Sequence, residues 1–538
     1  MVHDRLTGQS LTRCTGYLLL LVSSVIILLW MYRGALAPLN YDAAYNLQVV
    51  DSLVKGSGYA TSGAVRGQGP WLFDPYISTG PTVLLPAALM WWLSGGSLVA
   101  VHLLMLVFFG LYIVAIIGLV GWERENPLAA ASAVALPLTM TFSPGTVLGA
   151  VPGAAPVSLA FWPGMVLGEI PAAALMMVAA WALVRDRPWV AGLALGCAVQ
   201  AKVSFGLAGL ILAGMWLLAL FAEKPRGWHR SIGGFILAGV LPTLLFELYR
   251  FLSFGTVAGW LGSLTELGQF LDRQNVQNWL KPHHLGIKVG GFVQALESPG
   301  WLAVICALGG VCAFTAAARW PGQEPPAHTH PHADGAAIPA GATSSCHLAV
   351  HLAVHLGLVI GGTLMLWAWL GESRQESSRQ ATPALLLTLP SLGCIIGSLC
   401  TEARLKLGLT PFGHLIMRSL TALFLMCLLL ALLARSAALL RHDTSYARAA
   451  EQHHVAAIIR DADASSIVAR NWWQNPEFVL LTGLPAIPPG ASPRQLLIFQ
   501  DYESFLSGVS REEHRRRCGG VLYESPTTLV CWLPAPGE

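Results

Sequence analysis

The stretch YLLLLVSSVIILLWMYRGALAPLNYD, residues 17–42, places a carboxylate, Asp42, ten residues beyond a hydrophobic run that ends at Tyr32. The run lacks the small-residue cleavage site of a signal peptide, so it reads as a retained transmembrane helix. The 538-residue chain is 54% hydrophobic and 11% charged, with a mean hydropathy of +0.58. A soluble domain would not tolerate such a surface, so the sequence predicts a polytopic membrane protein. An ionisable side chain just outside its bilayer is a candidate for chemistry on a membrane-borne molecule.

Eleven hydrophobic runs approach the roughly 20 apolar residues that a membrane-spanning helix needs. They are residues 17–32, 98–120, 128–143, 166–184, 188–202, 203–221, 231–250, 299–317, 348–370, 381–400 and 412–436. Basic residues in the short connections, such as Arg124 and Arg185, place the N-terminus on the cytoplasmic side. For successive loops to alternate between the two sides of the membrane, the proline-flanked run Pro81–Leu93 must lie in the outer interface. If this run spans the membrane, the orientation of every later helix reverses. We therefore expect an all-α bundle of about 11–13 transmembrane helices in the inner (plasma) membrane of a bacterium.

The composition divides the chain into two parts. Residues 1–440 form the expected transmembrane domain, which includes a first outer loop over 33–97 with amphipathic helices. A low-complexity cytoplasmic stretch over 320–346 reads as a flexible connector or, through its histidines, as a weak metal site. Residues 441–538 are more polar and predict a small periplasmic α/β domain, with an amphipathic helix, short strands and a terminal hairpin.

The charge of the chain and the positions of its cysteines limit the binding partners and the disulfides that it can have. A net charge of +3, spread along the chain, gives no basic stripe of the kind that binds nucleic acid, so we expect no nucleic-acid partner. Eight of the ten cysteines lie in or beside hydrophobic runs and read as small packing residues. Cys518 and Cys531 would face each other across the terminal hairpin; whether they form a disulfide is left open.

Four charged residues from distant segments are expected at the outer membrane surface: Asp42, Glu169, Lys202 and Arg379. Two carboxylates and two cations suit a reaction between a nucleophile that must lose a proton and an anionic leaving group that must be neutralised. Phosphate is the obvious anion. Each residue also has a structural reading: a helix cap for Asp42, interhelical pairing for Glu169, snorkelling for Lys202 and a solvated loop for Arg379.

Several segments, in order, resemble the GT-C membrane glycosyltransferases that use polyprenyl-phosphate sugars, a family that includes protein O-mannosyltransferases and lipid A aminoarabinose transferases. LNYDAAYNLQVVDSLVKGSGYATSG (39–63) is similar to the family's acidic first-loop motif, and FDPYISTGPTVLLPAALMWWLSGGS (73–97) to its proline-led re-entering segment. The family's span with a second acidic residue is similar to VLGEIPAAALMMVAAWAL (166–183), and its span that ends in a lysine is similar to AGLALGCAVQAKVSF (191–205). The arginine that precedes a late span in the family is matched in ESSRQATPALLL (376–387). IVARNWWQNPEFVLLTG (467–483) resembles the small periplasmic domain of bacterial members.

The resemblance implies a role for each residue in an inverting sugar transfer to an acceptor hydroxyl. Asp42 would accept the hydroxyl proton, with Glu169 orienting a substrate or sharing this role. Donor phosphate would be held by Lys202, Arg379 and Arg66, and the other candidate substrate-binding residues are Tyr45, Asp74 and Trp162. Trp162 could equally be an interface anchor. The acceptor, whether glycan, lipid or protein, is not indicated.

The chain departs from the family pattern at three positions. Ala43 stands where many relatives have a second acidic residue, which puts a bridging metal in doubt and leaves a divalent ion open. Ala201 replaces the usual threonine before the lysine, and Gln380 replaces the aromatic residue after the arginine.

Two other classes compete with this reading. A transporter or lipid flippase would show repeated halves and charges near the bilayer centre, and neither is visible in the sequence. An O-antigen ligase type transferase would carry a more arginine-rich outer loop than residues 251–298, in which His283 and His284 would be the candidate bases.

Overall fold

The computed structural model consists of a helical bundle with a small α/β domain at one end. It describes residues 2–35, 38–39, 41–61, 71–72, 79–120, 127–139, 166–223, 227–262, 265, 342–371, 382–402, 419, 422–434, 437, 444–468, 475–500 and 510–534. The expected span over 299–317 and residues 320–341 of the connector expected over 320–346 lie outside these ranges, while residues 342–346 begin a helix.

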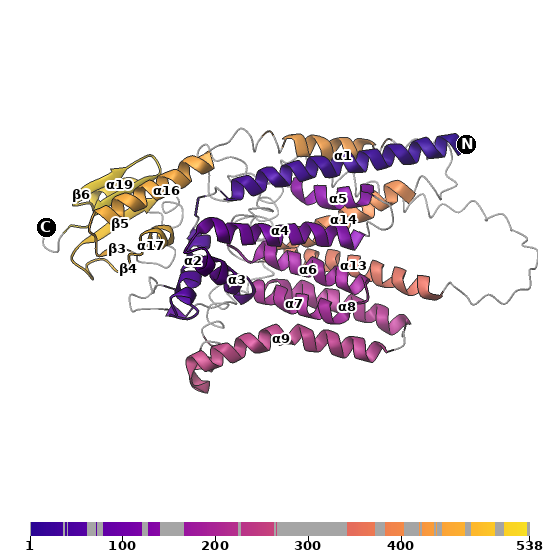
Figure 1. Cartoon of the computed structure of the whole chain (residues 1–538), viewed down its shortest axis with the longest axis horizontal. Helices are drawn as coiled ribbons and strands as arrows, with labels where there is room; N and C mark the ends of the chain where they lie inside the picture. The colour runs from indigo at the N-terminus through magenta and orange to yellow at the C-terminus, as the bar shows by residue number, and fades with distance from the viewer. Residues whose placement is uncertain are drawn as a thin grey trace, which may run out of the picture.

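Long apolar helices run side by side along the longest axis of the molecule (Figure 1). They are α1 (Val2–Ala35), α4 (Leu98–Val120), α5 (Pro127–Thr139), α6 (Glu169–Val184), α7 (Pro188–Ala201), α8 (Phe205–Glu223), α9 (Trp228–Phe254), α13 (Ala342–Gly371) and α14 (Thr382–Glu402). The tightest pairs are α7 with α9, α8 with α13, α5 with α14, and α6 with both α4 and α7. By length and composition α4, α8 and α9 can cross a membrane, and shorter apolar stretches lie within other described helices, for example Arg13–Leu29 in α1, or stand alone, as Ala422–Ala434 does. The predicted helical membrane bundle is confirmed.

Two short helices cover the end of the bundle opposite the N-terminus: α2 (Tyr41–Val54) and α3 (Pro81–Leu93) (Figure 1). The helix expected over Pro81–Leu93 is therefore present with these bounds. Its proline begins the first turn, where a missing N–H costs nothing, and Gly80 precedes it as the N-cap. A two-stranded pair, β1 (Ala60–Thr61) and β2 (Trp71–Leu72), adjoins α2.

The C-terminal segment folds as an α/β domain beside α2 (Figure 1). Its elements are α16 (Thr444–Asp461), β3 (Ser466–Val468), α17 (Pro476–Thr482), β4 (Ala486–Ile487), β5 (Gln495–Gln500), α19 (Arg511–Arg516), β6 (Gly520–Glu524) and β7 (Thr528–Trp532). The sheet order is β4-β3-β5-β7-β6, with β3 parallel to β4 and β5 and with β7 antiparallel to both β5 and β6. Buried apolar residues of α16, α17 and the central strands, such as Ile459, Phe478 and Ile498, form its core.

The terminal hairpin is cross-linked. Cys518 and Cys531 form a disulfide with a Cα–Cα distance of 5.5 Å. The sequence alone did not decide whether this disulfide forms. The two cysteines are 13 positions apart in the sequence and lie on either side of the β6–β7 turn.

Candidate active site where α2, α3, α6 and α7 meet

Three backbone segments meet closely at the α2 end of the bundle. The Gly80 N–H, at the start of α3, donates a hydrogen bond of 3.0 Å to the carbonyl of Ala201 at the end of α7. A Cβ on Gly80 would lie 1.7 Å from the Gln200 carbonyl oxygen, and one on Gly168 would lie 2.3 Å from that of Ala201. Glycine at both positions is therefore what lets α3 and the start of α6 reach the end of α7.

This junction brings together two residues predicted from the sequence. Glu169 begins α6, Lys202 follows the last residue of α7, and their charged groups pair with an Nζ–Oε1 distance of 3.4 Å. Both side chains are mostly shielded, with 22% of Lys202 and 12% of Glu169 exposed. The carboxylate stands at a helix N-terminus and the ammonium at a helix C-terminus, the arrangement that each helix dipole favours.

Asp42 lies in α2, a helix that contacts the segment before Glu169 through Asn46. The helix begins at Tyr41, so Asp42 lies within the first turn and is not the N-cap residue that the structural reading assumed. One turn later, Asn46 Nδ2 donates to Thr79 Oγ1 at 3.0 Å and to the Val166 carbonyl at 2.7 Å. Because residues four apart share a helix face, Asp42 is on the face of α2 that packs on the segment leading into Glu169.

Tyr45 packs beside this face and contacts β1. Burial raises the pKa of Tyr45 to about 12, and the nearby Thr61 side chain opposes that rise. The phenol is therefore protonated at every physiological pH and can donate a hydrogen bond. The remaining candidates, Arg66, Asp74, Trp162 and Arg379, lie outside the described residues.

Several polar residues at the α2 end of the bundle were not predicted from the sequence. Asn46 and Thr79 link α2 to the segments before α3 and α6, and the spacing of Asn46 four residues after Asp42 could have drawn attention to it. Tyr59 donates from its hydroxyl to the Thr79 carbonyl at 3.3 Å and packs edge-on against Phe246 of α9.

A second shielded ion pair lies near the C-terminal end of α9. Arg250 pairs with Glu247 at 3.0 Å, and the other Glu247 oxygen accepts a 2.7 Å bond from Trp260 Nε1. The sequence contains a signal that could have predicted this pair, because two opposite charges stand three residues apart in an otherwise apolar helix.

Within the described part of the chain, no three His, Cys, Asp or Glu residues come close enough together to hold a metal ion. The ion pair of Glu169 with Lys202 gives this carboxylate a cationic partner from the protein itself.

No family model and no curated protein sequence matches the chain. Among solved structures, the crystal structure of ArnT from Cupriavidus metallidurans in the apo state is similar over 96% of this chain and 98% of that chain. The TM-score is 0.53 and the sequence identity is 12%. At this identity the likeness concerns the fold, and it covers both the helical bundle and the C-terminal domain. The chain therefore has an ArnT-like fold.

Proposed function

We propose that the protein is an inverting glycosyltransferase that moves a sugar from a polyprenyl-phosphate donor to an acceptor hydroxyl at the periplasmic face of the membrane. The observation that carries the proposal is the shielded Glu169–Lys202 pair at the junction on which the Asp42-bearing face of α2 packs. A base and a phosphate-binding cation are the groups that such a transfer needs. The GT-C fold, which the resemblance in the sequence had led us to expect, supports the class of enzyme.

In the proposed reaction Asp42 accepts the proton of the acceptor hydroxyl as that oxygen attacks the anomeric carbon. The new carbon–oxygen bond forms as the bond between the sugar and the phosphate breaks, and the negative charge remains on the polyprenyl phosphate. Lys202 neutralises this charge, and Glu169 holds the lysine side chain in place. Arg379 and Arg66 are proposed as further phosphate ligands, and Tyr45, Asp74 and Trp162 as residues that contact the substrates.

The proposed membrane orientation follows from the ends of the helices. Arg185 and Arg187 lie in the α6–α7 turn, and Arg230 lies in the first turn of α9, at the end of the bundle away from α2. Basic residues concentrate on the cytoplasmic side of membrane proteins. The site and the C-terminal domain would then face the periplasm of a bacterial inner membrane.

The test is a transfer assay on purified full-length protein with a panel of radiolabelled polyprenyl-phosphate sugars. Asp42→Asn should lower kcat by about 10²–10⁴-fold, the typical contribution of a general base. Asp51→Asn is the matched control, because Asp51 lies in the same helix and pairs at the surface with Lys55. Transfer by Asp42→Asn at the wild-type rate would exclude Asp42 as the base.

The same assay separates the competing classes. A flippase would move the labelled lipid and leave the sugar–phosphate bond intact, so no free polyprenyl phosphate would form. An O-antigen ligase type transferase would use only diphosphate-linked donors, which the panel should therefore include.

A further inference from the structure

Hydrogen bonds on two sides hold helix α2 in place. On the bundle side, Asn46 bonds to Thr79 and Val166. On the other side, the C-terminal domain contacts the chain before and within the helix. The Gln452 side chain of α16 accepts from the Leu39 N–H at 3.0 Å and donates to the Leu39 carbonyl at 2.8 Å, while Gln48 Nε2 donates to the Pro476 carbonyl at 3.3 Å. Asp42 lies between the two contacts with the domain.

The Gln452 contact is well suited to fix a backbone. One side-chain amide bonds both the N–H and the C=O of a single residue, so it restrains the position and the rotation of that residue. A helix of 14 residues is marginal on its own, and tertiary contacts must therefore set the position of α2.

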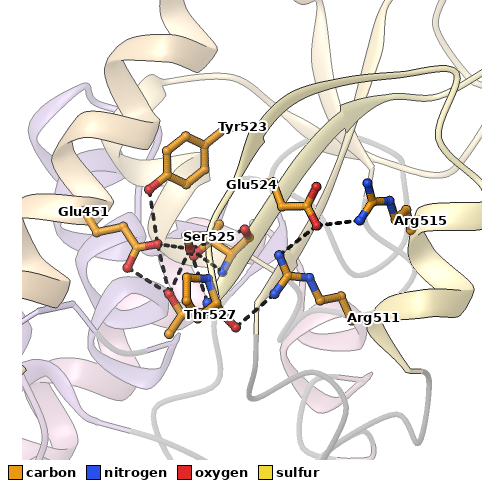
Figure 2. A network of polar contacts seen from close by, with 9 residues as sticks. Glu451, Arg511, Arg515, Tyr523, Glu524, Ser525 and Thr527 are labelled. Carbon is orange, nitrogen blue, oxygen red and sulfur yellow. Dashed lines mark hydrogen bonds and ion pairs between the residues drawn. The ribbon is translucent and has the colours of Figure 1, made fainter.

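Gln452 is itself held firmly. Its neighbour Glu451 accepts hydrogen bonds from the hydroxyl groups of Tyr523, Ser525 and Thr527 around the β6–β7 turn, as Figure 2 shows. On the other side of this turn, Glu524 pairs with Arg511 at 3.2 Å and Arg515 at 2.8 Å (Figure 2). The disulfide between Cys518 and Cys531 closes the same hairpin. The contacts thus run from the hairpin through α16 to Leu39.

We propose that Gln452 is a positioning residue for sugar transfer: it fixes the Leu39 backbone and thereby sets Asp42 against the junction of α6 and α7. The C-terminal domain is then a part of the active site and is not a separate binding module. The proposal rests on the proposed function, because it assigns Gln452 a role through the base of that reaction.

The kinetic test compares Gln452→Met, which retains the volume and removes both bonds, with His453→Met at the exposed next position of the same helix. We expect kcat of Gln452→Met to fall by roughly 10–100-fold, since a displacement of about 1 Å can cost 10²-fold. The donor KM should stay unchanged, because Lys202 is held by α7. Gln452→Glu, which can still accept from the Leu39 N–H, should lie between wild type and Gln452→Met. In an Asp42→Asn background Gln452→Met should cause little further loss.

A second measurement is independent of transfer. Hydrogen–deuterium exchange over residues 38–50 should become faster in Gln452→Met and remain unchanged in His453→Met. Unchanged exchange, faster exchange with wild-type kcat, or an equal loss in kcat and donor affinity would each overturn the positioning role. If the wild-type protein transfers no sugar from any donor of the panel, the proposed function fails, and the exchange data still decide whether Gln452 holds α2.

Discussion

Lys202 ends α7 with its ammonium group 3.4 Å from the Glu169 carboxylate, in a position where both side chains are mostly shielded from water. We predict that Lys202→Met raises the donor KM and lowers kcat/KM by roughly 10–100-fold, because a hydrogen bond to a charged group contributes about 1.5–3 kcal/mol. Lys202→Arg should keep part of the activity. Steady-state kinetics with a polyprenyl-phosphate sugar gives the answer.

A control and a double variant separate binding from stability. Lys55→Met removes an exposed lysine at the same end of the molecule and should leave kinetics unaltered. Removing Lys202 also leaves the Glu169 carboxylate without its cation, so Lys202→Met should be less stable than the double variant Lys202→Met/Glu169→Gln. If the double variant also regains transfer, Lys202 does not bind the phosphate.

At the scale of single residues, the sequence indicated the charged members of the site and missed the neutral ones. Glu169 and Lys202 stand out because a charge in an apolar segment is costly and needs a reason. Asn46 and Thr79 do not stand out, since an amide or hydroxyl is common in such segments and its partner is known only from the fold. The N-cap reading of Asp42 was wrong because α2 begins at Tyr41, a boundary that helix propensity does not fix to one residue.

At the scale of elements, the approach of α3 to α7 depends on Gly80. A Cβ at this position would lie 1.7 Å from the Gln200 carbonyl oxygen, a backbone atom that cannot move aside cheaply. Gly80→Ala should therefore destabilise the protein by at least about 1–3 kcal/mol, the usual cost of overpacking, and should displace α3. Thermal unfolding in detergent measures the effect.

Gly110→Ala is the matched control for Gly80→Ala. Gly110 lies inside α4, and a Cβ there meets no atom within 4 Å. Alanine is favoured over glycine in a helix by about 0.5–1 kcal/mol, so this variant should unfold at the same temperature or higher. Equal unfolding temperatures for the two variants would show that α3 does not depend on the close contact.

The burial of Tyr45 in α2 should make stability depend on alkaline pH. The pKa of Tyr45 is about 12 in the folded chain, against 10 for an ordinary tyrosine, so the folded state keeps a proton that the unfolded state loses between these values. This stabilisation is complete below pH 10 and disappears as the pH rises to 12, at about 1.4 kcal/mol per unit. The unfolding midpoint of wild type should therefore fall relative to that of Tyr45→Phe from pH 9 to pH 12; a constant difference between the two midpoints would contradict the shift.

At the scale of the whole molecule, the order of the helices and the presence of the C-terminal domain could be predicted. Long apolar runs and a sharp change in composition near residue 440 carry that information. The docking of the domain onto α2 could not be predicted, because it depends on contacts between residues some 400 positions apart, such as Leu39 and Gln452. Nothing in the local sequence of α16 distinguishes a glutamine that bonds a distant backbone from one that faces water.

The orientation of the molecule in the membrane can be tested with two matched aspartates. Asp186 and Asp463 are both exposed and have positive φ angles of 55° and 52°, and the ion pair of Asp463 with Arg494 is exposed and contributes little, so replacing either aspartate with cysteine should carry a similar cost. Asp186 lies in the α6–α7 turn, and Asp463 follows α16 at the opposite end of the molecule.

The labelling experiment uses bacterial cells that produce the protein with every cysteine except Cys518 and Cys531 replaced by serine. A membrane-impermeant maleimide should label Asp463→Cys in intact cells. Asp186→Cys should react only after permeabilisation, because the adjacent Arg185 and Arg187 favour the cytoplasmic side. Labelling in the reverse order would place the site and the C-terminal domain in the cytoplasm, where a periplasmic acceptor could not reach Asp42.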